Sequence, residues 1–333
     1  FEIHRYGKDV ATGDHLRFVL SDICIQQVEP NVVHGWKCAD NSISYATTGY
    51  LPNGRKTAVL NTDAEKFSLV RADSMETVYE GRLEEAGHPF NSLKTADFTP
   101  FTETGSYRIQ AGKIVTEPFV IAFDVFDTAL WKLTNFLYCE RCGDPVPCCH
   151  GTCHQDVLAE HKGKKLSFSG GWHDAADVSQ QTVQTAEVLE GLLSAAMKTK
   201  DSMLRLRMME EANWGLDFIL RMRFGDGYRA ANASIRRWTD GIQGNMDDWH
   251  ADVNNRSLEN FLFAAVEAGA SEAFRKLAPE LAWKCRKTAE EDFAFAQERF
   301  NRVGVEQPHM EEHTSNAGKS QYYAAAAWAA ARL

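Results

Sequence analysis

Thiol and imidazole groups are concentrated in one stretch near the middle of the chain. Five of the eight cysteines fall within fifteen residues, with histidines beside them. These five are Cys139, Cys142, Cys148, Cys149 and Cys153. Two thiolates and two imidazoles in this order are typical of a closed tetrahedral zinc site. The ligands would be Cys142, Cys153, His154 and His173.

Four protein ligands leave the metal no open position, so a zinc ion bound there would be structural. It would tie the cysteine loop to the residue that precedes Asp174. The alternative is a disulfide inside the cluster, for example from Cys139 or Cys148. Because the cluster holds spare cysteines, a zinc site and a disulfide are compatible.

Two carboxylates follow a pair of glycines in the segment Gly-Gly-Trp-His-Asp-Ala-Ala-Asp, residues 170–177. We expect this segment to open a helix, with Asp174 and Asp177 on one face of its first turn. Two carboxylates there can hold one water molecule, one removing its proton while the other orients it. A helix N-terminus favours the ionised form, which suits a base better than an acid. The alternative is that Asp174 is simply the N-cap.

Two kinds of local pattern surround these residues. Short apolar runs separated by turn residues predict a small β-sandwich in the first part of the chain. The expected strands are 57–60, 67–70, 77–79, 105–109 and 118–121. After residue 121 the apolar residues recur with helical spacing, and almost no strand is expected. The expected helices are 126–137, 178–192, 208–220, 258–268, 272–299 and 321–333, which predicts an all-α second domain of helical hairpins.

Length and composition limit the class of protein. The 333 residues, 44% hydrophobic and 25% charged, predict a globular chain of two or three domains. A net charge of −10 argues against a nucleic-acid partner and fits a neutral ligand or a hard cation such as Ca²⁺. The longest apolar run, 322–331, is far shorter than the ~20 residues of a membrane span. The chain starts at Phe1 without an initiator Met or a signal peptide, so we expect it to be part of a longer product.

The segment 170–177 resembles the Gly-Gly-Trp-His-Asp-Ala-Gly-Asp motif of glycoside hydrolase family 9, the inverting cellulases. The Arg-Cys-Gly at 141–143 and the Cys-His at 153–154 resemble the zinc loop of members with an N-terminal immunoglobulin-like domain. Residues 47–121 resemble that domain, and residues 211–220 resemble the third barrel helix of the family. The resemblance covers most of residues 45–333.

The resemblance implies an immunoglobulin-like β-sandwich followed by an (α/α)6 barrel with a glycan cleft on its open face. It implies that Asp177 is the general base and that Asp174 helps to position the water. The metal ligands carry over as Cys142, Cys153, His154 and His173. Aromatic rings commonly stack on sugars in such clefts. The candidates are Trp172, Trp238 and Trp249, each of which is equally compatible with a place in the core.

We therefore divide the chain into an unassigned segment (1–42), the sandwich (43–121) and the N-terminal part of the catalytic domain (122–333). Ala176 replaces the Gly of the family motif, and Val-Ser-Gln at 178–180 replaces its common Tyr-Gly continuation. The family's general acid is a Glu near the end of the barrel. Glu306, Glu311 and Glu312 do not fit its sequence context. With about six of twelve helices, the barrel is expected to be only partly present and the acid to lie outside this chain.

The sequence thus predicts an inverting glycoside hydrolase acting on a β-linked glucan, outside the cytoplasm, in a secreted, periplasmic or cell-surface protein. The alternative is a non-catalytic glycan-binding relative in which the departures from the family motif mark a lost activity. A zinc hydrolase is disfavoured because it requires an open metal position.

Overall fold

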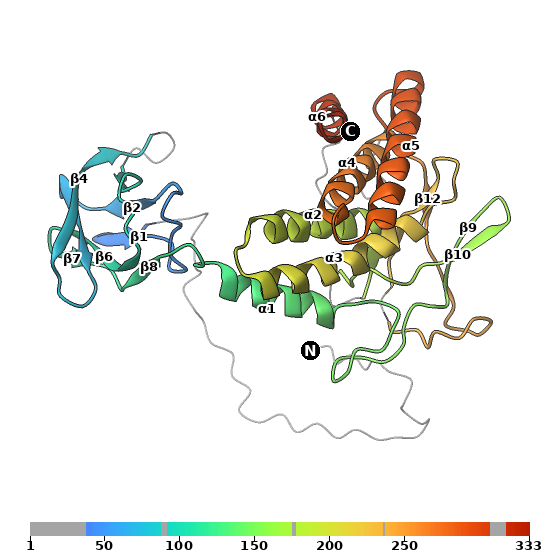
Figure 1. The fold of residues 1–333 in the computed structure, drawn as a ribbon, viewed down its shortest axis with the longest axis horizontal. Helices are drawn as coiled ribbons and strands as arrows, with labels where there is room; N and C mark the ends of the chain where they lie inside the picture. The colour runs from blue at the N-terminus through green and yellow to red at the C-terminus, as the bar shows by residue number, and fades with distance from the viewer. Residues whose placement is uncertain (1–37, 88–91, 175–177, 236, 307–317) are drawn as a thin grey trace, which may run out of the picture. The chain divides into compact units, whose positions relative to one another are not determined.

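The computed structural model describes residues 38–87, 92–174, 178–235, 237–306 and 318–333 (Figure 1). These residues form two compact units that divide between Ala129 and Leu130. Of the N-terminal segment 1–42, all but the last five positions lie outside the described residues.

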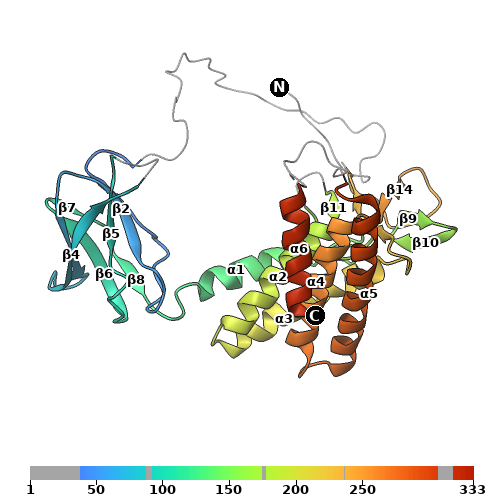
Figure 2. The ribbon, with the colours of Figure 1, turned by 90° about the horizontal axis from the view of Figure 1, so that it is seen from above.

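The first unit is an antiparallel β-sandwich (Figure 2). Its strands are β1 (Ser42–Ser44), β2 (Thr57–Asn61), β3 (Lys66–Arg71), β4 (Thr77–Glu85), β5 (Lys94–Asp97), β6 (Gly105–Ala111), β7 (Ile114–Val115) and β8 (Phe119–Ile121). One layer has the order β1-β2-β5-β4, and the other has β4-β3-β6 with β7 and β8 paired to β6. Strand β4 joins both layers, because its first part pairs with β3 and its last residues pair with β5. The predicted immunoglobulin-like sandwich is confirmed.

Alternating burial along the strands builds the core of this unit. In β6, Tyr107, Ile109 and Ala111 are buried and the residues between them are more exposed, as expected for a strand with one face inward. The five strands expected from the sequence are all present. Strands β1, β5 and β7 were not predicted, because they are short and β1 and β5 are largely polar.

The second unit is mainly helical. Its helices are α1 (Asp127–Cys139), α2 (Thr182–Lys198), α3 (Ser202–Arg221), α4 (Ser257–Phe274), α5 (Pro279–Val303) and α6 (Lys319–Arg332). All six expected helices are found. Three boundaries were wrong: α2 begins at Thr182 rather than near 178, and α3 begins at Ser202 rather than near 208. The predicted helix 272–299 is divided between the end of α4 and α5. The break is consistent with Pro279, which favours the first turn of a helix.

The expectation of almost no strands in this unit was wrong. Short strands occur in its loops: β9 (Val157–His161), β10 (Lys164–Ser167), β11 (Gln180–Gln181), β12 (Arg229–Ala230), β13 (Asn232–Ala233), β14 (Trp249–His250) and β15 (Val253–Asn254). They form three small sheets. Most are two residues long and pair with partners far away in the sequence, so local periodicity gives no signal for them.

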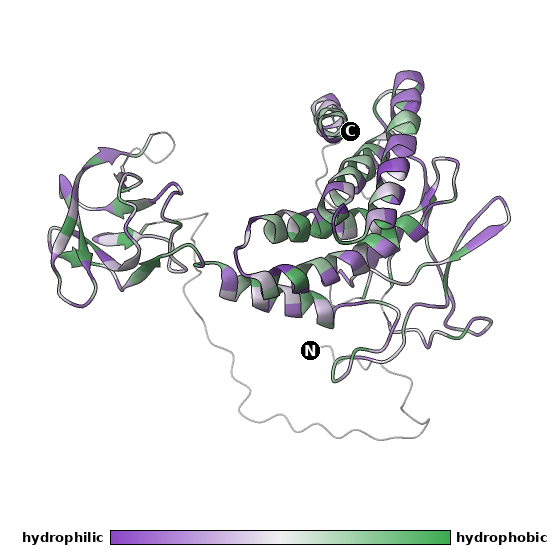
Figure 3. Cartoon of the chain, in the orientation of Figure 1, coloured by the Kyte–Doolittle hydropathy of each residue, from purple (hydrophilic) through white to green (hydrophobic). Residues whose placement is uncertain are grey.

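Helix packing gives the unit its core. Helix α2 packs on α3 and α4, and α4 lies between α5 and α6 (Figure 2). The β9–β10 hairpin and much of α5 are hydrophilic (Figure 3). The described residues contain six helices, half the number of an (α/α)6 barrel, so the barrel is only partly present. None of these helices is both long enough and apolar enough to cross a bilayer.

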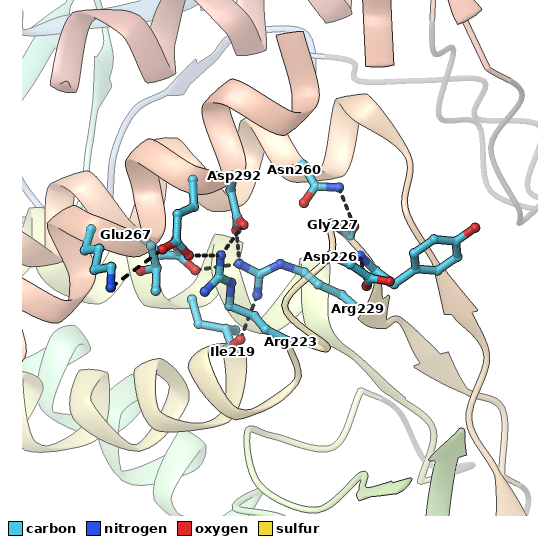
Figure 4. A network of polar contacts seen from close by, with 12 residues as sticks. Ile219, Arg223, Asp226, Gly227, Arg229, Asn260, Glu267 and Asp292 are labelled. Carbon is cyan, nitrogen blue, oxygen red and sulfur yellow. Dashed lines mark hydrogen bonds and ion pairs between the residues drawn. The ribbon is translucent and has the colours of Figure 1, made fainter. Parts of the chain in front are cut away.

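A buried ion-pair network joins α4 and α5 to strand β12 (Figure 4). Arg229 pairs with Glu267 at 2.6 Å and with Asp292, and its guanidinium lies 4.1 Å from the centre of the Phe263 ring. Arg223 reaches the other oxygen of Asp292 at 2.6 Å. Burial raises the pKa of Glu267 to about 7. Removing one partner would leave an uncompensated buried charge, so the network fixes how these elements meet.

Gly215 in α3 should not tolerate a side chain. A Cβ built there would overlap the buried indole of Trp172. Gly215→Ala should therefore lower the free energy of unfolding by about 1–3 kcal/mol, although alanine has the better helix propensity. Gly191 in α2 is the matched control, because a Cβ there meets nothing within 4 Å, and Gly191→Ala should raise the free energy of unfolding by about 0.5–1 kcal/mol. Urea titrations measure both, and equal stabilisation by the two changes would contradict this packing.

Candidate metal centre and catalytic loop

The four predicted zinc ligands lie together and are buried, with one ligand atom from each within 4.8 Å of the others. Cys142 Sγ lies 3.1 Å from His154 Nδ1, and Cys153 Sγ lies 3.5 Å from His173 Nε2. The two imidazole nitrogens are 3.2 Å apart. A zinc tetrahedron with Zn–S near 2.3 Å and Zn–N near 2.0–2.1 Å has edges of roughly 3.3–3.8 Å. The donor set and its spacing therefore fit a zinc ion.

Backbone hydrogen bonds hold the ligand segments against each other. The Cys142 amide donates to Gly171 O at 3.0 Å, and the His173 amide donates to Glu140 O at 2.8 Å. The residues after α1 and the segment 171–173 thus run antiparallel, with an isolated bridge between Arg141 and Trp172. This pairing brings the first and last ligands together although they are far apart in the sequence.

A buried amide beside the centre is explained by a metal-bound thiolate. Cys142 Sγ lies 3.3 Å from Gln180 Oε1, while Gln180 Nε2 is buried and has no hydrogen-bond partner among the described residues. A thiol would donate to the amide oxygen, but a thiolate can only accept. The orientation of a side-chain amide is an assignment. When the oxygen and nitrogen of the Gln180 amide are exchanged, Nε2 donates a hydrogen bond to the Cys142 thiolate and is no longer without a partner.

The surroundings shift the pKa values of the two thiols in opposite directions. Burial raises the pKa of Cys142 well above its usual value. The hydrogen bond with Cys142, supported by those with His154 and His173, holds the pKa of Cys153 far below the usual value. A bound metal ion deprotonates its thiol ligands outright. A metal ion bound here would therefore offset the cost of ionising the buried Cys142 thiol.

Glu211 on α3 anchors both ligand segments. Its carboxylate is fully buried and accepts two hydrogen bonds from Arg141, at 3.1 and 2.9 Å, and one from Trp172 Nε1 at 2.8 Å. Arg207 donates to it from the preceding turn at 3.3 Å. No role for Glu211 was predicted from the sequence. The sequence held one sign of such a role: Glu211 is an acidic residue on a helix face whose other members, Met208 and Ala212, are apolar.

The two glycines of the motif allow the loop to approach α3. Both have positive φ values, 114° at Gly170 and 65° at Gly171. A Cβ at Gly171 would meet the Phe218 ring and the Thr185 hydroxyl at 2.8 Å. Trp214 Nε1 donates to Gly171 O at 2.7 Å. The loop is therefore seated on one face of α3 through contacts that only glycine permits.

The expected place of Asp174 in a helix was wrong. Helix α2 begins at Thr182, and its N-cap is Gln181, so Asp174 is neither in the first turn nor the cap. Gln180 and Gln181 pair instead with strand β13, which prevents the helix from starting earlier. Asp174 is exposed, and its amide donates to Ser179 O at 2.8 Å. Asp177, with residues 175 and 176, lies outside the described residues.

The three candidate tryptophans have different surroundings. Trp172 is only 5% exposed and lies in the helical core, which contradicts a role in stacking on substrate. Trp238 is 38% exposed and stacks on His150 and His154, at 5.1 and 6.1 Å between ring centres. Trp249 in β14 is also 38% exposed, with the Arg237 guanidinium 5.9 Å from its ring centre. Of the three, only Trp238 and Trp249 are partly exposed.

Three aspartates close in sequence to the predicted zinc ligands form a separate group of possible oxygen ligands. Carboxylate oxygens of Asp156, Asp240 and Asp247 lie within 4.8 Å of one another. Oxygen ligands of this kind suit Ca²⁺. Asp156 is buried and already accepts hydrogen bonds from Thr239 Oγ1 at 2.5 Å and from the Gly241 amide at 3.1 Å. The sequence was compatible with Ca²⁺ but indicated no ligands for it; these three aspartates are the all-carboxylate group of this kind in the described parts of the chain.

Glu306 is held as an anion. It pairs with Arg299 at 2.6 Å and accepts hydrogen bonds from the amide and hydroxyl of Ser257, each at 3.1 Å. Although burial opposes it, the pairing with Arg299 leaves the pKa of Glu306 below its usual value. A general acid needs a raised pKa, so Glu306 does not suit that role. Glu311 and Glu312 lie outside the described residues.

Comparison with known proteins agrees with the fold. Endoglucanase D of Acetivibrio thermocellus is 27% identical over 287 residues, which cover 77% of this chain and 45% of that protein. A cellodextrinase of Butyrivibrio fibrisolvens is 30% identical over 156 residues, covering 44% of this chain and 28% of that protein. A solved metagenome-derived family 9 endoglucanase is 25% identical, with a TM-score of 0.60 over 88% of this chain and 60% of that one.

A solved Zn-binding triple mutant of the family 9 endoglucanase J30 is 25% identical, with a TM-score of 0.57 over 85% of this chain and 59% of that one. The chain spans about half the length of such relatives. Residues 39–116 match the cellulase N-terminal ig-like domain, and residues 126–333 match glycosyl hydrolase family 9. Since the second match alone covers more than half of its residues, the chain belongs to glycosyl hydrolase family 9 and carries the N-terminal immunoglobulin-like domain found in cellulases.

Proposed function

We propose that the gene product is an inverting glycoside hydrolase that cleaves a β-linked glucan, cellulose-like or related, and that this chain supplies the base side of its active site. The observation that carries the proposal is the family 9 match over residues 126–333, which includes the Asp174–Asp177 loop. The relatives named as endoglucanases support the substrate class. Because polysaccharides are met outside the cytoplasm, we place the protein at the cell surface, in the periplasm or in the medium.

In this proposal Asp177 removes a proton from the attacking water and Asp174 orients that water. An inverting enzyme keeps its two catalytic carboxyl groups about 6.5–9.5 Å apart, so that the water fits between base and sugar. Asp174 is exposed, which suits a group that meets water and substrate. The flanking residue His173 is fixed in the cysteine-histidine centre, so the loop starts from a rigid point. Trp238 and Trp249 are the aromatic residues that we propose to contact the glycan.

We further propose that Cys142, Cys153, His154 and His173 bind a structural zinc ion. When bound, the ion cross-links the loop after α1 to the catalytic loop. Four protein ligands exclude a metal-bound nucleophile and thus a zinc hydrolase. The contacts among these histidine and cysteine side chains hold the start of the catalytic loop in its position.

Zinc should be present at about one ion per chain in protein purified without added metal. Cys153→Ser removes one ligand and should lower both the zinc content and the melting temperature, because the free energy of binding a structural metal is folding free energy. Cys285→Ser is the matched control: Cys285 is equally buried but belongs to the helical core, so its variant should keep the zinc. Elemental analysis and thermal unfolding measure both. A wild-type protein without zinc, with Cys142 and Cys153 in disulfides, would contradict the site.

Asp177→Asn in the complete gene product should abolish most of the turnover while glycan binding survives. The change keeps the shape of the side chain and removes its basicity, and general-base assistance typically contributes about 10²–10⁴-fold. Asp174→Asn should also slow turnover, through a misplaced water. Asp73→Asn, on an exposed turn of the sandwich, is the control and should have no effect.

Near-normal release of reducing sugar by Asp177→Asn would remove this residue from the mechanism. Binding without hydrolysis by the wild type would favour the non-catalytic relative.

The 333-residue chain assayed by itself should not hydrolyse β-glucans. Asp174 and Asp177 belong to one short segment, whereas the acid must protonate the leaving oxygen from the opposite face. Met203, Trp283 and Tyr323 are each more than half exposed on the helices, so the isolated chain should also tend to associate. Reducing-sugar release and size-exclusion chromatography test both points. Hydrolysis by this chain that is lost in Glu306→Gln would show that the acid lies here after all.

A further inference from the structure

The buried carboxylate of Asp156 holds the turn that follows Trp238. Asp156 is fully buried, and both of its side-chain oxygens accept hydrogen bonds from this turn. Oδ1 accepts from the Thr239 hydroxyl at 2.5 Å, and Oδ2 accepts from the Gly241 amide at 3.1 Å. A buried carboxylate is costly unless it is hydrogen-bonded, so the fold favours the arrangement in which the turn supplies both donors.

Thr239 joins the same turn to a predicted metal ligand. Its side chain is buried, and its hydroxyl accepts a hydrogen bond from the His154 amide at 2.9 Å while it donates to Asp156. A hydroxyl can do both at once, because it has one proton and two lone pairs. The Trp238 ring also stacks on His154, with 6.1 Å between ring centres. Trp238 is therefore held through its ring and through the residue that follows it.

The main chain of Asp156 contacts the second partly exposed tryptophan. The Trp249 amide donates to Asp156 O at 3.4 Å, and Trp249 pairs with Val157 where β14 runs parallel to β9. The Arg237 guanidinium, from the residue before Trp238, lies 5.9 Å from the centre of the Trp249 ring. The two tryptophans thus share one neighbourhood, and Asp156 is bonded to the segments that carry them.

The contacts around this anchor are close. Gly241 has a φ of 75°, and a Cβ there would lie 2.9 Å from Thr152 Cγ2. Gln243 Nε2 donates to Gln155 O at 3.2 Å, in an exposed position. A hydrogen bond that is shielded from water is electrostatically stronger than an exposed one. The buried bond between Thr239 and Asp156 is therefore the contact that should matter most for the position of Trp238.

We propose that Asp156 is a positioning residue for glycan binding, which fixes Trp238 through the Thr239 hydroxyl and Trp249 through its own carbonyl. This inference rests on the function proposed above, because it takes the two rings as contacts of the glucan. Sugar faces stack on aromatic rings, and rings that are already in place lose less freedom on binding. Loss of the anchor should therefore weaken the affinity for the glucan and leave the turnover of bound substrate nearly unchanged.

Thr239→Val in the complete gene product tests the anchor, because valine resembles threonine in shape but has no hydroxyl. The Kd for cellohexaose should rise about 3–10-fold, as expected for the loss of one buried hydrogen bond, while kcat changes less than about twofold. Thr239→Ser keeps the hydroxyl and is the matched control, with a Kd close to that of the wild type. Calorimetric titration in an Asp177→Asn background gives the Kd without hydrolysis, and reducing-sugar release gives kcat.

A double-mutant cycle separates positioning of Trp238 from a general loss of structure. If Thr239 acts through the indole ring, Thr239→Val should add less than about a twofold loss of affinity to that of Trp238→Ala. Full loss of affinity from each change in the double variant overturns the proposal. An unchanged Kd in Thr239→Val overturns it as well.

Hydroxyl-radical labelling without sugar tests the position of the ring independently of glycan binding. Thr239→Val should increase the labelling rate of Trp238 several-fold and leave that of the exposed Trp283 unchanged. A wild type that binds no cellohexaose contradicts the proposed function, and the labelling of Trp238 then decides the positioning, which an unchanged rate overturns. If Thr239→Val does not fold, Asp156→Asn, which replaces one acceptor oxygen by a donor, takes its place with the same expected results.

Discussion

The candidate site depends on the hydrogen bonds that the buried carboxylate of Glu211 accepts. A fully buried carboxylate is costly unless it is paired and hydrogen-bonded, and here Arg141 and Trp172 provide its partners. Arg141 directly precedes the first metal ligand, Cys142, and Trp172 directly precedes the last, His173. One side chain of α3 therefore sets the position of both ligand segments before any metal binds. A bound zinc ion would stabilise an arrangement of the two ligand segments that the Glu211–Arg141 ion pair already favours.

The parts of the site that follow from chemistry were predictable from the sequence. Thiol and imidazole groups at these positions indicated the metal centre, and the structure brings all four side chains together. Helical spacing likewise located all six helices. The local conformation of the catalytic loop was not predictable, because Gln180 and Gln181 pair with Asn232 and Ala233, far along the chain. Burial of the loop residue Trp172 depends on Gly215 in α3, which no local pattern records.

Val178, close to the anchored Asp174, carries backbone strain. Val178 has a φ of 55°, a conformation that is unfavourable for a β-branched residue. It is retained because Asp174 bonds to Ser179 on one side, and Gln180 enters a strand pair on the other. Strain of this kind persists only where the surroundings over-determine it, and it clusters at functional sites. The hydrogen bond to Ser179 and the strand pairing of Gln180 thus prevent a helical turn here. They also fix the position of Asp174 relative to His173.

A raised pKa does not by itself identify a general acid, as two carboxyl groups of this unit show. Glu267 has a pKa raised to about 7, in the range that suits an acid at neutral pH, but it is fully buried against Arg229 and cannot reach a glycosidic oxygen. Glu306 is less enclosed, but its pairing with Arg299 favours the anion. An acid must combine access to the substrate with an environment that keeps its proton, and neither residue has both. Asp174, by contrast, is exposed, so its side chain has the access to water that the buried Glu267 lacks.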